Sequence, residues 1–157
     1  MLFELAEKEP SRCLPHPVHV LCDDFATGCR IDGFPQYISI FREKRISAVM
    51  LIQSETQLTS MYSQMEAATI INNCDTIIYL GGMDVSTCES LSRRAGRPMQ
   101  ELLTMPIGAE YFFRRGQKPV VTKRYDTYSD PLYAQMLRLK DTEAKPEPCR
   151  EPDAASA

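Results

Sequence analysis

Val18-His-Val-Leu-Cys-Asp-Asp24 is an apolar run of the length of a β-strand, and it ends in two adjacent carboxylates. Strands that are buried on both faces of a parallel sheet have continuous apolar runs of this kind. In such sheets, ligands bind in the crevice at the carboxyl ends of the strands. The stretch therefore predicts a buried strand over 18–22 that presents Asp23 and Asp24 to a ligand.

Two further apolar runs have a similar length. Residues 48–52 end at Gln53, and residues 76–80 end at a pair of glycines. Apolar side chains at helical spacing occupy the intervals between the runs, over 34–41 and over 56–72. Alternating strands and helices of this kind predict an α/β fold, in which a parallel sheet is flanked by helices.

Short signals mark the ends of other helices. Residues 2–9 keep helical spacing up to Pro10. Asp84 is placed to cap a helix that ends at Gly96, because Asp accepts backbone hydrogen bonds at helix starts and Gly adopts the left-handed turn at helix ends. We therefore expect helices over 2–9 and 85–95.

The pattern changes after residue 105. Apolar residues at 111–113 and 119–122 flank the segment Arg114-Arg115-Gly-Gln-Lys118. Two strand-like runs around a short turn with a glycine are typical of an antiparallel hairpin. The sequence predicts such a hairpin near the carboxyl terminus, with a basic tip.

The length of 157 residues and the hydrophobic content of 43% suit one domain with a single core. Residues 131–139 predict a last short helix. From residue 140 onward the chain is rich in proline and alanine, a composition typical of disorder. We expect a domain over 1–139 and a disordered tail over 140–157.

Other features of the composition exclude several classes of protein. The six cysteines form no C-x-x-C pair, and several lie in apolar runs, so we expect them to be reduced. The two histidines, three positions apart, point to opposite faces of an extended segment, which argues against a zinc site. No apolar stretch approaches the roughly 20 residues of a membrane-spanning helix, and we expect a cytoplasmic chain.

Charge is unevenly distributed along the sequence. The net charge is −3 and the isoelectric point is near 5.4, which is not typical of a dedicated nucleic-acid binder. From residue 93 to residue 124, however, two acidic residues accompany eight basic ones, namely Arg93, Arg94, Arg97, Arg114, Arg115, Lys118, Lys123 and Arg124. This excess suits contact with phosphates or with an acidic partner, although a solvated surface explains it as well.

The polar residues at the predicted strand ends have the chemistry of a nucleotide site. Asp23 is placed to hold Mg²⁺, directly or through water, and Asp24 to orient or deprotonate a water that attacks a γ-phosphate. Gln53 can contact the γ-phosphate or that water through its amide. The alternative is that these residues simply end their strands in solvent. Arg42, just before the second strand, can stabilise charge at a subunit boundary or lie at a solvated helix end.

The phosphate-binding half of such a site has no counterpart in this sequence. A phosphate loop has the form G-x-x-x-x-G-K-[ST], and the nearest spacing, from Gly28 to Gly33, continues with Phe34-Pro35. We therefore expect the phosphates to be held by another polypeptide stretch.

Four segments in this order resemble the type IV coupling proteins, the TraG and TraD conjugation ATPases, and the likeness covers about residues 1–125. The segments are Pro17-Val-His-Val-Leu-Cys-Asp-Asp-Phe-Ala26, Arg45-Ile-Ser-Ala-Val-Met-Leu-Ile-Gln-Ser-Glu-Thr-Gln-Leu58, Asn73-Cys-Asp-Thr-Ile-Ile-Tyr-Leu-Gly-Gly82 and Phe113-Arg-Arg-Gly-Gln-Lys-Pro119. The resemblance implies part of a RecA-like (P-loop NTPase) fold. It also implies Mg²⁺ and ATP in the complete site, hexamers anchored at the inner membrane, and ATP-driven delivery of DNA through a type IV secretion system.

The resemblance also implies roles for single residues. Asp23 matches the Walker B aspartate, Asp24 the neighbouring acid and Gln53 the glutamine after the next strand, while Arg42 falls at an arginine position. Two positions depart from the family pattern, because Asp24 replaces the usual Glu and Thr27 a common Asn. The family's membrane helices and phosphate loop are expected upstream of Met1.

Three interpretations follow. The first is a truncated portion of a coupling ATPase that carries the Walker B side and is inactive alone. The second, since the matching region overlaps the TraM recognition part of TraD and TraG, is a non-catalytic module that binds a TraM-like relaxosome protein or DNA through Arg114, Arg115 and Lys118. The third is a decayed gene fragment, whose open sheet edge would favour aggregation.

Overall fold

The computed structural model describes residues 2–143, in two compact units that divide between Lys123 and Arg124. The domain that the sequence predicts over 1–139 includes the start of the second unit. The elements of the first unit are α1 (Leu2–Lys8), β1 (Val18–Cys22), α2 (Phe34–Ile40), the 3₁₀ turn η1 (Arg42–Lys44), β2 (Ile46–Met50), α3 (Glu55–Met61), α4 (Gln64–Asn73), β3 (Thr76–Tyr79), α5 (Val85–Ala95), α6 (Met99–Leu103), β4 (Ala109–Arg114) and β5 (Val120–Lys123).

Strands β1 and β2 form a parallel pair, as the sequence predicts. Val18 lies opposite Ile46 at one end of the pair, and Cys22 lies opposite Met50 at the other. Strand β2 begins two residues earlier than its apolar run indicates. The reason is Arg45, whose left-handed backbone (φ 58°) closes η1 and turns the chain into the strand at once.

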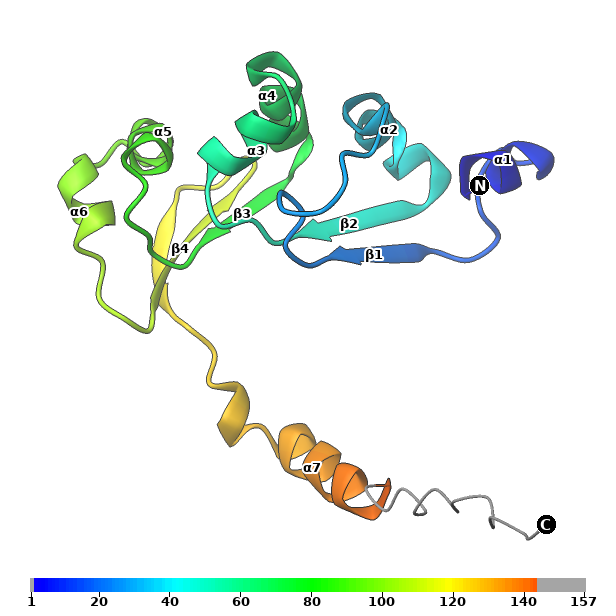
Figure 1. Cartoon of the computed structure of the whole chain (residues 1–157). Coiled ribbons are helices and arrows are strands. Elements are labelled where there is room, and N and C mark those ends of the chain that lie inside the picture. The colour runs from blue at the N-terminus through cyan, green and yellow to red at the C-terminus, as the bar shows by residue number, and fades with distance from the viewer. Residues whose placement is uncertain (1, 144–157) are drawn as a thin grey trace, which may run out of the picture. The chain divides into compact units, whose positions relative to one another are not determined.

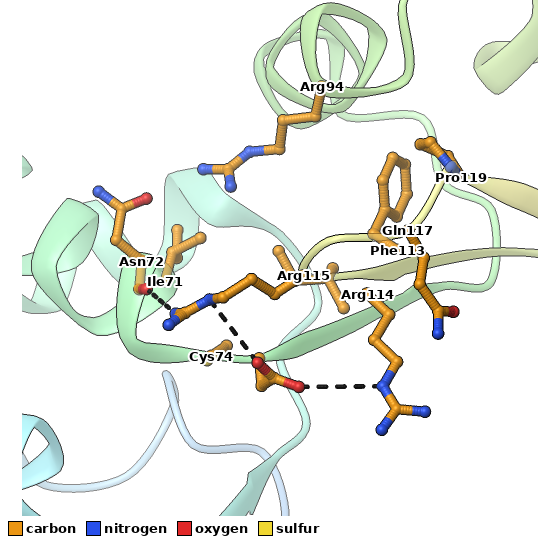
Figure 2. Close-up of a pocket in the computed structure, with 11 residues that line it drawn as sticks. Ile71, Asn72, Cys74, Arg94, Phe113, Arg114, Arg115, Gln117 and Pro119 are labelled. Carbon is orange, nitrogen blue, oxygen red and sulfur yellow. Dashed lines mark hydrogen bonds and ion pairs between the residues drawn. The ribbon is translucent and has the colours of Figure 1, made fainter.

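Strand β3 does not join this pair by hydrogen bonds, which corrects the prediction of one parallel sheet. It pairs antiparallel with β4, with Tyr79 opposite Tyr111, and β4 pairs antiparallel with β5. The backbone N–H of Arg115 donates to the carbonyl of Asp75 at 2.9 Å, so the hairpin turn lies beside the start of β3 (Figure 2). The mixed α/β class and the basic hairpin are confirmed. The difference from the prediction is that β3 pairs with β4 and not with the parallel strands.

The helices cover one face of the strands. Figure 1 shows α2, α3, α4 and α5 on the same side of β1, β2 and β3. Residues alternate along β1 and β2 between this covered face and the opposite one, where Leu21 is 73% exposed and Val49 is 59% exposed. The parallel pair is therefore covered on one face by the described residues, and it presents apolar side chains on the other.

The larger core cluster lies beneath the loop that follows β1. Phe25 packs against Phe34 and Tyr62, with ring centroids 4.8 and 5.9 Å away. Leu58 of α3 and Ile70 of α4 belong to the same cluster, and each is 1% exposed. The aromatic core thus fixes the segment that carries the acidic pair.

A second core cluster joins β3 and β4 to α5 and α6. Cys88 of α5 is fully buried and contacts Tyr79 of β3, and Leu102 of α6 is 1% exposed. Asp84 accepts a hydrogen bond from the backbone N–H of Thr87 at 2.9 Å, and Gly96 ends α5 in the left-handed conformation, as the sequence predicts. Helix α6 is absent from the prediction, because five residues are too few to show a helical period.

The described part of the second unit consists of the 3₁₀ turn η2 (Thr127–Ser129) and helix α7 (Pro131–Glu143). The helix continues four residues beyond the predicted end at 139. Residues 144–157, the remainder of the predicted tail, lie outside the described residues. Among the described residues, no helix is long and apolar enough to span a membrane.

Candidate functional site

The acidic pair lies in a tight turn directly after β1. Asp24 has a left-handed backbone (φ 46°), and its carbonyl accepts hydrogen bonds from the backbone N–H and the hydroxyl of Thr27 at 2.9 and 2.8 Å. One carboxylate oxygen of Asp23 accepts from the N–H of Asp24 at 3.0 Å. Both side chains are exposed, so their remaining oxygens face solvent.

Gln53 lies at the same end of the parallel pair. The N–H of Leu51 donates to the carbonyl of Cys22, and the N–H of Phe25 donates to the carbonyl of Leu51, both at 2.9 Å. These bonds tie the acidic turn to the segment that leads from β2 to Gln53. Ser54 then caps α3 by accepting from the N–H of Gln57 at 3.0 Å. The structure therefore places Asp23, Asp24 and Gln53 at the edge formed by the carboxyl ends of β1 and β2, as the sequence predicts.

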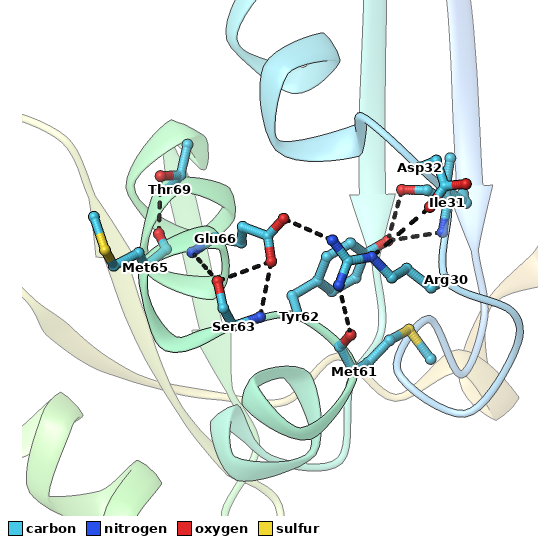
Figure 3. Close-up of polar contacts among 9 residues, drawn as sticks. All are labelled: Arg30, Ile31, Asp32, Met61, Tyr62, Ser63, Met65, Glu66 and Thr69. Atoms are coloured by element: carbon cyan, nitrogen blue, oxygen red, sulfur yellow. Dashed lines mark hydrogen bonds and ion pairs between the residues drawn. The ribbon is translucent and has the colours of Figure 1, made fainter.

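Arg30 connects the loop after the acidic pair to α3 and α4 (Figure 3). Its Nη2 lies 2.7 Å from Oε1 of Glu66, its Nη1 donates to the carbonyl of Met61 at 3.5 Å, and its guanidinium carbon lies 5.2 Å from the centre of the Tyr62 ring. The hydroxyl of Tyr62 in turn accepts from the N–H of Ile31 at 3.1 Å. The acidic turn is thus followed by two anchoring contacts, the packing of Phe25 in the aromatic core and the ion pair of Arg30 with Glu66.

Glu66 has two roles in this contact. Together with Ser63 it forms a capping box at the start of α4, in which the N–H of Ser63 donates to Oε2 of Glu66 at 2.9 Å. Hydrogen bonds from the backbone and side chain of Ser63, and then the charge of Arg30, lower the pKa of Glu66. The sequence reasoning missed this contact. The motif Ser63-x-x-Glu66 was a readable signal for the cap, but nothing in the sequence singles out Arg30.

Arg42 lies apart from the acidic pair within this chain. It begins η1, before the amino end of β2, whereas Gln53 follows the carboxyl end of that strand. Its side chain is exposed. The structure therefore does not bring Arg42 together with Asp24 and Gln53.

The basic hairpin forms a second candidate site. Arg114 and Arg115 flank Asp75, with Nε to carboxylate distances of 4.0 and 3.6 Å, and Nη2 of Arg115 donates to the carbonyl of Asn72 at 3.1 Å (Figure 2). Arg94 of α5 lines the same hollow, which has a volume of about 270 Å³. Lys118 is exposed and does not line the hollow.

The acidic turn suits Mg²⁺ that is bound partly by water and phosphate better than it suits a metal ion whose ligands all come from the protein. Within residues 2–143, no group of three or more His, Cys, Asp or Glu side chains is placed to hold a metal ion. Mg²⁺ commonly keeps several waters and binds one or two carboxylates together with substrate phosphates. The exposed oxygens of Asp23 and Asp24 fit that kind of site.

Comparisons with known proteins identify the family to which the chain is similar. A family model described as the TraM recognition site of TraD and TraG matches residues 17–102. No curated protein sequence matches the chain significantly.

Several solved structures of the coupling protein TrwB have the same fold. The bacterial conjugative coupling protein TrwBdeltaN70 in its unbound monoclinic form has a TM-score of 0.65 and 18% identity, over 76% of this chain and 33% of that one. Plasmid coupling protein TrwB in complex with ADP and Mg²⁺ has a TM-score of 0.67 and 17% identity, over 78% and 34% of the two chains. This chain thus spans about a third of the TrwB chains that it resembles.

At identities below 20%, the TrwB structures establish the fold, which is that of one part of a coupling protein. The family model covers more than half of the sequence and contains both β1 and β2 with the acidic pair between them. The chain therefore belongs to the TraG and TraD family of coupling proteins, over the region described as the TraM recognition site.

Proposed function

We propose that this chain forms part of a conjugative coupling ATPase of a type IV secretion system and carries the Mg²⁺- and water-handling side of the nucleotide site. The observation that supports the proposal is the common position of Asp23, Asp24 and Gln53. They follow two hydrogen-bonded parallel strands, at the edge where sheets of this class bind ligands. The solved TrwB structures, which include complexes with ADP and Mg²⁺ and with GDPNP, have the same fold over this region.

Each residue of this edge has a distinct role in the proposal. Asp23 offers the carboxylate oxygen that does not accept from Asp24 N–H, and this oxygen holds Mg²⁺ or one of its waters. Asp24 orients and accepts a proton from the attacking water, and the amide of Gln53 contacts that water or the γ-phosphate. Bound Mg²⁺ supplies positive charge against the phosphates as they are cleaved.

The phosphate-binding side comes from another polypeptide stretch in this proposal, because the 157 residues contain no G-x-x-x-x-G-K-[ST] motif. The chain alone therefore does not hydrolyse ATP. In the assembled protein, proposed to be a hexamer at the cytoplasmic side of the inner membrane, Arg42 contacts the site of the neighbouring subunit. DNA transfer is the proposed outcome of ATP turnover.

A chimera tests the nucleotide site. Residues 17–123 replace the matching part of TrwB, and the binding of ADP is measured with and without Mg²⁺. We expect Mg²⁺-dependent binding that is weakened about tenfold or more by Asp23→Ala, a loss of at least about 1.4 kcal/mol, but not by His19→Ala on the same strand. Circular dichroism verifies that both variants fold.

Two outcomes would refute the proposal. One is that the folded chimera binds ADP in a Mg²⁺-dependent way and that Asp23→Ala leaves this binding unchanged. The other is ATP turnover by the purified 157-residue chain that disappears on Asp23→Ala, since the chain is proposed to be inactive alone.

A second function is favoured by the name of the matching family model and by the basic hairpin. In this proposal the chain binds a TraM-like relaxosome protein or DNA through Arg114, Arg115 and Lys118, all of which are exposed. Binding should weaken as salt rises, and it should be reduced when the three residues become Ala. Binding that is unchanged by these substitutions would exclude the hairpin as the contact surface.

A further inference from the structure

Apolar side chains, called here the floor, and arginine side chains, called here the rim, together line the hollow beside the basic hairpin (Figure 2). Its volume is about 270 Å³, and it lies between the end of α4, the start of β3, the last turn of α5 and the β4–β5 hairpin. Ile71, Ile77 and Phe113 supply apolar surface to its lining, and Phe113 is buried. Arg94 and Arg114 supply positive charge. A ligand that fits this lining must be apolar on one side and anionic on the other.

The positive charge of the rim is only partly neutralised. Asp75 is the acidic residue of the lining, and it lies 3.6 Å from Arg115 and 4.0 Å from Arg114. Arg115 is additionally held by the carbonyl of Asn72. Arg94 has no hydrogen bond or ion pair with any of residues 2–143. A guanidinium carries five N–H donors, so Arg94 and Arg114 retain donors for an incoming anion.

The lining favours a carboxylate on a peptide over the backbone of a nucleic acid. Asp75 lies among the arginines and repels any incoming anion, so the hollow favours a ligand with few negative charges over a closely spaced row of phosphates. An apolar floor offers nothing to a phosphate backbone, whereas it can accept an aliphatic or aromatic side chain. Arginine forks match carboxylates and phosphates alike in a bidentate geometry, so the apolar residues of the lining are what favour a peptide.

We infer that this hollow binds an acidic peptide segment of a partner protein, with one apolar side chain on the floor and neighbouring Asp or Glu side chains on Arg94 and Arg114. The inference rests on the second proposed function and specifies the partner. It differs from that proposal in adding Arg94 and in leaving Lys118 outside the contact. It does not depend on the nucleotide site.

Fluorescence anisotropy with synthetic probes tests the inference. The probe is a labelled peptide Asp-Glu-Leu-Phe-Glu-Asp, compared with a version in which Ser replaces Leu and Phe, with a version in which Asn and Gln replace the acids, and with a single-stranded DNA oligonucleotide. We expect the first peptide to bind, and each altered peptide to bind about tenfold more weakly. Arg94→Ala should weaken binding of the first peptide by a similar factor.

Arg97→Ala is the matched control, because it removes the same charge from the same region without lining the hollow. It should leave peptide binding unchanged, and Arg94→Lys should have an intermediate effect. Thermal unfolding of each variant verifies the fold. Asp23→Ala should also leave peptide binding unchanged, so a failure of this inference is distinguishable from a failure of the nucleotide site.

Three outcomes would overturn the inference. One is equal binding of the acidic peptides with and without the apolar pair, which would show attraction by surface charge alone. The second is an equal loss of binding in Arg94→Ala and Arg97→Ala. The third is binding of the oligonucleotide in place of every peptide, which would make the hairpin a nucleic-acid contact.

Discussion

Arg30 and Glu66 are 36 positions apart in the sequence, and their side chains meet at 2.7 Å. This ion pair joins the loop behind the acidic turn to the start of α4. Its side chains are 45% and 28% exposed, so the contact is partly protected from solvent. The orientation of the acidic turn is therefore coupled to the packing of α3 and α4.

Replacing Arg30 with Ala should lower the midpoint of thermal unfolding, because the ion pair and the contact with the Tyr62 ring are both lost. Arg93→Ala is the control. Arg93 pairs with Glu89 at the same 2.7 Å, but these side chains are 79% and 56% exposed, and exposed pairs contribute little. An equal effect of the two substitutions, measured by calorimetry, would contradict the structural role of Arg30.

The contribution of Glu66 to stability should depend on pH. Hydrogen bonds from Ser63 and the charge of Arg30 lower its pKa in the folded protein below the ordinary value of a glutamate. A lowered pKa in the folded state means that the stabilisation is fully present above the unfolded pKa and is lost as the pH falls through the folded one. The difference in unfolding midpoint between the wild type and Glu66→Gln should thus be largest near neutrality and shrink below about pH 4.5. A difference that grows on acidification would contradict this.

Leu58→Ala should be strongly destabilising. Leu58 is 1% exposed and packs in the cluster beneath the acidic turn. Removing its buried methyl groups leaves a cavity, and such substitutions cost about 2–5 kcal/mol. The free energy of unfolding in urea measures the effect. Met65→Ala in α4 is the control, because Met65 is 83% exposed and its loss should change the free energy little.

Asp84→Ala should destabilise α5 and its contact with α3. Asp84 accepts from the N–H of Thr87 at 2.9 Å and from the hydroxyl of Thr56 at 2.9 Å. Loss of a helix cap typically costs about 1 kcal/mol. Asp84→Asn keeps a capping oxygen and should retain most of the stability. Urea denaturation that ranks Asn below Ala would be incompatible with a capping role.

The cysteines should differ in their reactivity toward a maleimide. Cys29 is exposed, Cys88 is buried, and burial raises the pKa of Cys74 although the charge of Arg94 partly opposes this. Because the thiolate is the reactive form, we expect Cys29 to be labelled first and Cys74 and Cys88 last. Mass spectrometry of a Cys149→Ser variant measures the order, and early labelling of Cys88 would contradict the packing of α5.

The sequence predicts the strand over 18–22 with the observed bounds, because its apolar run lies between Pro17 and Asp23. The edge shared by Asp23, Asp24 and Gln53 follows from the same reasoning, since parallel strands align their carboxyl ends. The partner of β3 could not be predicted in this way, because an apolar run does not encode the direction of the neighbouring strand. Arg30 was missed for a similar reason, since an ion pair across 36 positions has no local pattern.

The left-handed backbone at Asp24 has a consequence for the choice of residue there. Asp, Asn and Gly tolerate this conformation better than longer side chains do. Asp at position 24 is therefore compatible with the left-handed backbone there. A Glu at this position would have a longer side chain, but its backbone would be more strained. Asn at this position keeps the shape while deleting the charge, which makes Asp24→Asn the cleanest separation of chemistry from geometry that this chain offers.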